Sequence, residues 1–201
     1  MKQLWVVAGP NGSGKTTLVQ KYIGRFAHQV PVVNPDEIAA AIRPSAPGSA
    51  AMQAGRNALK LQNQYLNEGE SFLLETTFSG KRELKILQKA KEKGFKVNLI
   101  FVGLPDFKRN IKRIVRRVAD GGHDVPTEDI IRRYHRSINN LAMGLTLADR
   151  AFVFDNQGKK HQLIAVFEQG NIIRQADQFP GWFEKSIRRM RIEDAGRRFA
   201  G

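Results

Sequence analysis

The sequence predicts an α/β fold with a mainly parallel central sheet flanked by helices, a short helical lid, and a C-terminal β-hairpin plus helix. Two observations lead to it. Short apolar runs alternate with helical stretches along the chain, which is typical of a parallel sheet wrapped by helices. A glycine-rich loop also joins the first apolar run to the first helix. At 201 residues, the chain has the length of one domain, so we expect residues 1–201 to form a single domain.

Strands are predicted where a short apolar run ends at a polar or glycine-containing turn. Five such runs precede a terminal pair of runs that reads as a hairpin around Gln169 and Gly170. The predicted strands cover residues 4–8, 30–33, 71–74, 96–102, 151–154, 162–167 and 171–174. Ligands of such folds lie beyond the C-terminal ends of the parallel strands, so the residues just past each strand are the candidates for function.

Helices are predicted between these strands. One of them is opened by Asp36 or its neighbour, and another ends before Gly94, a residue suited to the position after a helix. A long helix over residues 105–119 is rich in Lys and Arg. The remaining predicted helices cover residues 15–23, 51–68, 82–93, a stretch from about 126 past 134, and 180–199.

Composition limits the classes of function. Lys and Arg number 33 against 19 Asp and Glu, giving a net charge of +14 that favours anionic partners such as nucleotides, nucleic acid or an anionic membrane. The chain has no Cys, which excludes disulfides and thiolate metal sites. No apolar run has the length of a membrane span and no signal-peptide pattern is present, so we expect a cytoplasmic protein. The four His residues show no metal-ligand spacing.

The glycine-rich loop fits the pattern G-x-x-x-x-G-K-[ST] at every fixed position, with a strand before it and a helix after it. Its glycines can turn successive N–H groups toward phosphate oxygens, Lys15 can reach the β- and γ-phosphates, and the Thr16 hydroxyl can bind Mg²⁺. The sequence therefore predicts a P-loop that binds ATP or GTP together with Mg²⁺. The predicted nucleotide-binding residues are Gly9, Pro10, Asn11, Gly12, Ser13, Gly14, Lys15, Thr16 and Thr17.

Acidic residues follow three of the other predicted strands. Asp36 can be a helix N-cap, or a general base or hydroxyl ligand that faces the γ-phosphate. Glu75 can hold substrate or the magnesium shell, or can cap the next turn, and Thr76, Thr77 and Ser79 add hydroxyl groups there. Asp155 can be a second acid beside the loop or a turn former with its neighbour Asn156.

Residues 113–136 combine a basic helix, a Gly-Gly hinge and a second basic helix. Phosphoryl transfer needs positive charge on the transferring group, and arginines on a closing lid supply it. The alternative is a pair of solvated basic helices. A third basic cluster, at residues 185–198, is interpreted as the charged face of the terminal helix.

Several stretches resemble the zeta-toxin-like P-loop kinases, and together they cover nearly the whole chain. The most specific is the lid stretch Gly121-Gly122-His123-Asp124-Val125-Pro126, followed by Arg132-Arg133-Tyr134. The others are residues 8–17, Asn34-Pro35-Asp36-Glu37-Ile38-Ala39, Glu75-Thr76-Thr77-Phe78-Ser79-Gly80, Arg117-Val118 and Asp155-Asn156.

The resemblance implies an ATP- or GTP-dependent kinase that uses Mg²⁺ and phosphorylates a hydroxyl group of a small molecule, for example UDP-N-acetylglucosamine. It implies that Asp36 is the catalytic base. The other implied catalytic groups are Lys15, Arg117 and Arg133, and the implied substrate-binding residues are Glu75, Thr76, Thr77 and Arg132, the last being the alternative to Arg133 on the phosphates.

The chain also departs from the toxins of this family. The N-terminal extension that docks an antitoxin is absent ahead of Leu4, and Thr76-Thr77-Phe78 follows the acid where the toxins usually carry a Gly. Two alternative functions remain at this stage. One is a toxin held by an antitoxin, and the other is a nucleic-acid-binding P-loop protein or polynucleotide kinase, suggested by the positive charge.

Overall fold

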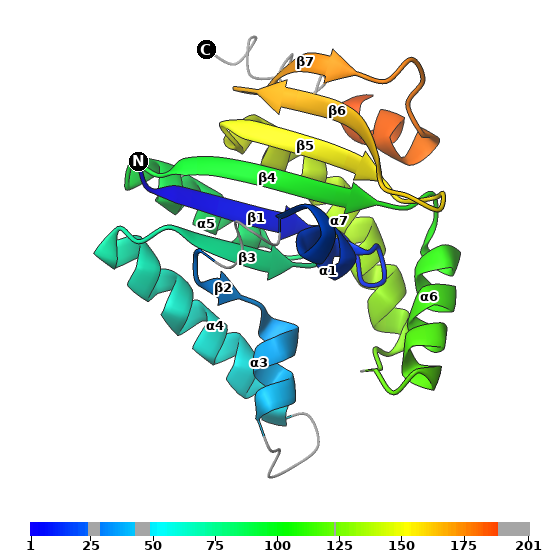
Figure 1. The fold of residues 1–201 in the computed structure, drawn as a ribbon, viewed down its shortest axis with the longest axis horizontal. Helices are drawn as coiled ribbons and strands as arrows, with labels where there is room; N and C mark the ends of the chain where they lie inside the picture. The colour runs from blue at the N-terminus through cyan, green and yellow to red at the C-terminus, as the bar shows by residue number, and fades with distance from the viewer. Residues whose placement is uncertain (24–28, 43–48, 123, 189–201) are drawn as a thin grey trace.

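A computed structural model describes residues 1–23, 29–42, 49–122 and 124–188. Within this part of the chain, seven strands form one sheet in the order β2-β3-β1-β4-β5-β6-β7 (Figure 1). Neighbouring strands are parallel from β2 to β5, whereas β6 and β7 join antiparallel as a C-terminal hairpin. The predicted fold, a mainly parallel sheet with a terminal hairpin, is therefore confirmed.

Six of the seven predicted strands differ from the observed ones by one or two residues at their ends. The exception is the strand predicted at residues 30–33, which is observed only as β2, Val32–Val33. Pro31 has no N–H to donate, so it cannot extend the ladder, although its carbonyl accepts a hydrogen bond from Leu73 N. The other strands are β1 Gln3–Ala8, β3 Phe72–Thr76, β4 Lys96–Gly103, β5 Arg150–Asp155, β6 Gln162–Glu168 and β7 Asn171–Gln175.

The helices follow the predicted pattern of one helix or helix pair between consecutive parallel strands. They are α1 Lys15–Leu18 with the π-helical turn η1 Val19–Ile23, α3 Pro35–Ala41, α4 Ser49–Glu68, α5 Lys81–Glu92, α6 Phe107–Ala119 and α7 Thr127–Leu147. Residues 181–188 are helical as well. The rest of the predicted final helix, most of the basic cluster at 185–198, and His123 lie outside the described residues.

Both faces of the sheet are covered by apolar side chains. Alternate residues of β1 separate the two cores: Leu4 and Val6 belong to the larger one, and Val7 belongs to the smaller. The larger core packs against α4, α5, α7 and the helix at residues 181–188, whereas the smaller one packs against α1 and η1. Burial on both faces explains why the central strands are almost uniformly apolar.

The parallel register brings the C-terminal ends of the strands together at one edge. Ala8 of β1 is level with Thr76 of β3 and Phe101 of β4, and Gly103 is level with Asp155 of β5. The glycine-rich loop and the segments after β3, β4 and β5 therefore meet at this edge, with α6 beside them (Figure 1). In open α/β sheets, this edge is where ligands bind.

Candidate active site

Side chains from distant parts of the chain hold carbonyl groups of the glycine-rich loop by hydrogen bonds. Asn110 Nδ2 donates to Asn11 O at 2.5 Å, and Asn156 Nδ2 donates to Ser13 O at 2.8 Å. His161 Nε2 lies 3.1 Å from Gly14 O. In the described part of the chain, neither the Gly12 N–H nor the Gly14 N–H donates to a backbone carbonyl. The loop therefore presents free N–H groups at the start of a helix, which is an anion-binding arrangement.

Glycine is required at the turning points of this loop. Gly9, Gly12 and Gly14 have φ values of 142°, 72° and 98°, in the region that side chains rarely adopt. A Cβ on Gly12 would lie 2.9 Å from Asn110 O, and one on Gly14 would meet the Asn156 amide. The motif glycines thus permit both the backbone conformation and the close approach of the residues that hold the loop.

Lys15 is buried within the loop. Its ammonium donates to Gly9 O at 2.8 Å and to Pro10 O at 3.2 Å. Burial lowers the pKa of Lys15, and the negative charges of Glu75 and Asp36 oppose this effect. Positive charge on Arg117 and Arg133 lowers the pKa of Lys15 further. Both acids and both arginines that the sequence singles out therefore act electrostatically on Lys15.

Glu75 contacts the residue that is predicted to bind the metal. Thr16 Oγ1 donates to Glu75 Oε1 at 2.8 Å, and Asn34 Nδ2 lies 3.3 Å from Glu75 Oε2. Burial raises the pKa of Glu75, while the charge of Lys15 and the hydrogen bond from Thr16 lower it. Of the roles considered for Glu75, this contact favours the magnesium shell over a turn cap.

The donors at this point suit a magnesium ion carried by a triphosphate. A carboxylate and a hydroxyl are the hard oxygen donors that Mg²⁺ prefers, and the phosphates would complete its coordination. Among the described residues, no group of three or more His, Cys, Asp or Glu side chains could hold a metal ion by itself. Thr16 and Glu75 are therefore the protein groups that fit the ion.

Asp36 is not the N-cap of its helix, contrary to one of the interpretations of the sequence. Asn34 caps α3, because its Oδ1 accepts a hydrogen bond from Asp36 N at 3.0 Å and Pro35 takes the first helical position. The Asp36 side chain is exposed, and its carboxylate has no hydrogen-bond or ion-pair partner in the described part of the chain. It is therefore available to a ligand.

The three arginines of the predicted lid differ in their contacts with the loop. Arg133 Nη1 lies 3.4 Å from Asn11 Oδ1, and its Nη2 pairs with Asp129 at 3.2 Å. Arg132 pairs with the other oxygen of Asp129 at 2.7 Å and is half exposed. Arg133, and not Arg132, is thus the one in contact with the phosphate loop. Arg117 is exposed on α6.

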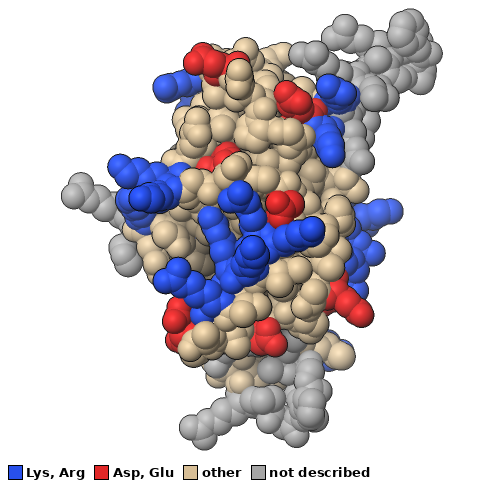
Figure 2. Space-filling view, turned by 90° about the vertical axis from the view of Figure 1, so that its right-hand side faces the viewer, with Lys and Arg blue, Asp and Glu red and all other residues tan. Residues whose placement is uncertain are grey.

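Arg113 of α6 joins two of the segments at this edge. Its guanidinium donates to Asn156 O at 2.6 Å and lies 3.4 Å from Ser13 O. Figure 2 shows that Lys and Arg side chains gather on this face of the molecule, near the middle of the view. Lys15, Arg113 and Arg133 thus place positive charge at the loop, where it would attract a triphosphate.

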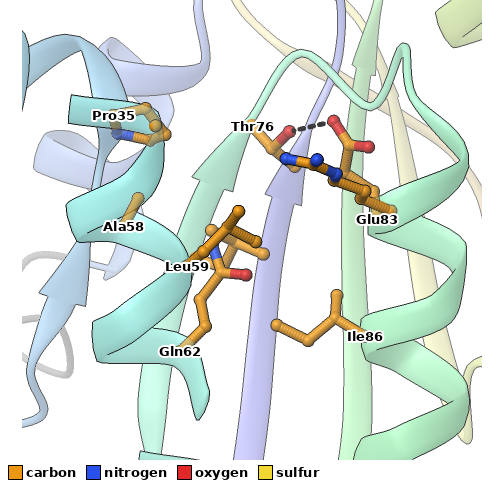
Figure 3. A pocket seen from close by; sticks show the side chains of 10 residues that line it. Pro35, Ala58, Leu59, Gln62, Thr76, Glu83 and Ile86 are labelled. Atoms are coloured by element: carbon orange, nitrogen blue, oxygen red, sulfur yellow. Dashed lines mark hydrogen bonds between the residues drawn. The ribbon is translucent and has the colours of Figure 1, made fainter. Parts of the chain in front are cut away.

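Thr76 and Thr77 are held by local hydrogen bonds after β3. Thr76 Oγ1 donates to Glu83 Oε1 at 3.0 Å and accepts from Phe78 N, and the hydroxyls of Thr77 and Ser79 are 2.9 Å apart. Thr76 also lines a pocket of about 200 Å³ between α4 and α5 (Figure 3). Pro35 and Thr76 line the end of this pocket where β3 ends and α3 begins.

Sequence reasoning missed the residues that hold the loop from behind. Asn110 and Arg113 were counted within a basic helix, Asn156 as a turn former, and His161 as a histidine without ligand spacing. Their contacts with the loop span 99 to 147 residues of sequence. The signals in the sequence were the position of Asn156 directly after a parallel strand and the resemblance of Asp155-Asn156 to the kinase family.

Comparison with known proteins agrees with this geometry. A family model described as an AAA domain matches residues 4–140. An uncharacterized protein of Haemophilus influenzae is 37% identical over 138 residues, which are 65% of this chain and 96% of that protein.

Two solved structures share the fold over almost the whole chain. A crystal structure of AvrRxo1-ORF1:-ORF2 with ATP is 17% identical with a TM-score of 0.70, covering 94% of this chain. This chain spans only 64% of that protein's length. The PezAT chromosomal toxin-antitoxin system of Streptococcus pneumoniae is 14% identical with a TM-score of 0.60, covering 95% of this chain and 85% of the other. The predicted resemblance to zeta-toxin-like P-loop kinases is confirmed in the fold.

Proposed function

Since the chain belongs to the AAA domain family, whose model matches residues 4–140, we propose that it is an ATP-dependent phosphotransferase. It moves the γ-phosphoryl group of ATP, or of GTP, to a hydroxyl group of a small molecule. A nucleotide sugar such as UDP-N-acetylglucosamine is the acceptor that the resemblance implies. ATP in the AvrRxo1-ORF1:-ORF2 crystal structure supports the choice of nucleotide.

One observation carries the proposal: the Asp36 carboxylate is exposed and without a hydrogen-bond or ion-pair partner among the described residues, two positions after Asn34, whose amide lies 3.3 Å from Glu75. A carboxylate at this point suits an incoming hydroxyl group, because it can orient the oxygen and accept the proton.

The reaction follows from these positions. The acceptor oxygen forms a bond to the γ-phosphorus, the bond between that phosphorus and the β–γ bridging oxygen breaks, and ADP leaves. Asp36 takes the hydroxyl proton. Lys15 and the loop N–H groups hold the phosphates, and Arg133 and Arg117 neutralise charge on the transferring group. Mg²⁺ bound at Thr16 and Glu75 would neutralise charge on the β- and γ-phosphates.

The test is the Asp36→Ala variant. A group that acts only in the transition state lowers kcat when removed, so this variant should lose phosphoryl transfer and bind ATP as the wild type does. Lys15→Ala is the contrasting variant, which should lose both nucleotide affinity and transfer. The readouts are ATP binding by calorimetry and acceptor-dependent ADP release in a screen of nucleotide sugars, nucleosides and small alcohols. Wild-type rates in Asp36→Ala would overturn its assignment as base.

A further inference from the structure

The pocket between α4 and α5 has a composition that restricts the acceptor. We propose that it binds the body of the phosphate acceptor and that this acceptor is a compact polyol bearing one anionic group, a carboxylate or a phosphate monoester, which Arg82 recognises. The inference rests on the proposed phosphotransferase function, because it places the acceptor of that reaction.

Position is the first argument. Pro35 and Thr76 lie at the end of the pocket where β3 finishes, whereas Gln62 and Ile86 lie toward the other end (Figure 3). Thr76 is level with Ala8, the last residue before the phosphate loop, and Pro35 opens the helix that carries Asp36. A molecule seated in the pocket therefore has one end at the sheet edge where the loop and α3 begin, from which a hydroxyl group could reach toward the γ-phosphoryl group.

Size is the second argument. The pocket has a volume of about 200 Å³, below the roughly 300–1,000 Å³ of pockets that enclose drug-sized ligands. It therefore suits a compact molecule, smaller than the nucleotide sugar that the resemblance implies. Gly55 of α4 lines the same space, and a Cβ added there would meet no atom within 4 Å.

Chemistry is the third argument. Apolar side chains form one part of the lining, and polar groups form the rest, as a polyol with CH faces and hydroxyl edges requires. The apolar lining residues are Pro35, Ala58, Leu59, Leu74 and Ile86, and the polar ones are Gln62, Thr76, Arg82 and Glu83. The Glu83 carboxylate is engaged by the Thr76 hydroxyl at 3.0 Å.

The Arg82 guanidinium, in contrast, makes no ion pair or hydrogen bond within the described ranges, not even with the adjacent Glu83. An unpaired guanidinium in the lining of a pocket presents a fork of donors that matches a carboxylate or a phosphate. The pocket thus offers hydroxyl-binding groups, an apolar surface and one cation to its ligand, and the acceptor should carry the complementary anion.

The experiment compares acceptors that differ only in their charge. The pairs are glycerate and glycerol, gluconate and glucitol, and N-acetylglucosamine 1-phosphate and N-acetylglucosamine. ADP release with ATP is measured for the full chain, and binding of each compound is measured separately by calorimetry. The variants are Arg82→Gln and, as a control, Lys85→Gln, which removes one exposed charge from the same helix outside the pocket.

We expect the anionic member of at least one pair to be used with a kcat/KM about 10-fold or more above its neutral partner, as a hydrogen bond to a charged group allows. Arg82→Gln should remove this preference by raising the KM for the acid, with kcat and the KM for ATP little changed. Lys85→Gln should behave as the wild type.

The outcomes separate this inference from the proposed function. Equal use of neutral and anionic partners, or equal effects of the two substitutions, overturns the inference and leaves phosphoryl transfer intact. Arg82-dependent binding of an acid without any transfer supports the pocket and overturns the transfer. If no acid binds and none is used, the inference is wrong.

Discussion

Asn156 gives the sharpest test of how the phosphate loop is held. The Asn156 side chain is buried, and its Nδ2 donates to Ser13 O at 2.8 Å. The backbone carbonyl of Asn156 accepts a hydrogen bond from Arg113. In Asn156→Ala, the only described donor left to Ser13 O would be Arg113 Nη1, at the long distance of 3.4 Å. The carbonyl would then be free to turn toward the phosphate side, where it would repel an anion.

The expected size follows from the lost bond. Leaving a buried carbonyl poorly satisfied costs roughly 1–3 kcal/mol, and for a chain of this length each kcal/mol lowers Tm by about 2–4 °C. We therefore expect a Tm lower by about 2–12 °C. If ordering the loop again costs a similar free energy when ATP binds, the Kd for ATP should rise about 10-fold, since ~1.4 kcal/mol of binding free energy corresponds to that factor.

The assay pairs thermal denaturation with calorimetric titration of ATP. Gln157→Ala is the matched control, because Gln157 is exposed and, in the described part of the chain, it forms hydrogen bonds through its backbone N and O and not through its side chain. That variant should keep the wild-type Tm and Kd. If Asn156→Ala also stays within about 1 °C and twofold of the wild type, the side chain does not hold the loop.

Two further predictions concern buried carboxylates. Burial raises the pKa of Glu75, so the charged form costs folding free energy, and this part of the stability is present at low pH and lost as pH rises through the raised pKa. At neutral pH, the free energy of unfolding of Glu75→Gln should therefore be no lower than that of the wild type, while its rate of phosphoryl transfer falls roughly 10–100-fold. Denaturation and rate measurements check this, and a loss of stability as large as the loss of activity would contradict it. Trp182 Nε1 donates to the buried Asp155 at 2.8 Å, so Trp182→Phe should destabilise the fold by about 1–3 kcal/mol, and an unchanged denaturant midpoint would show that the bond contributes nothing.

The sequence predicts the phosphate loop because its residues are consecutive. It also predicts that Glu75 lies near the loop, since strand ends meet at one edge of a parallel sheet, and β1 and β3 are neighbours with Val7 level with Glu75. The spacing of motifs could not decide between Arg132 and Arg133, because that choice depends on the rotation of α7 about its axis. The structure turns Arg133 toward Asn11.

The supporting residues were beyond sequence reasoning for a different reason. Asn110 looks like a polar residue within a basic helix, yet it is fully buried and bonds to Asn11. Nothing local marks it, because its role depends on α6 crossing beside the loop. His161 likewise approaches Gly14 because β6 runs antiparallel to β5, so that the start of β6 lies level with Asp155 at the C-terminal ends of the parallel strands.

The role of α6 changes how the predicted lid should be understood. Asn110 and Arg113 attach the first half of this helix to the phosphate loop and to Asn156. The residues from Val115 to Asp120 are exposed, and Gly121 has a φ of 84° with open space around its Cα. A movement of the whole helix would break the bonds that hold the loop in its phosphate-binding form. We therefore expect lid closure to involve the segment beyond Arg113, so that Arg117 can move toward the transferring phosphoryl group while the loop beneath it stays fixed.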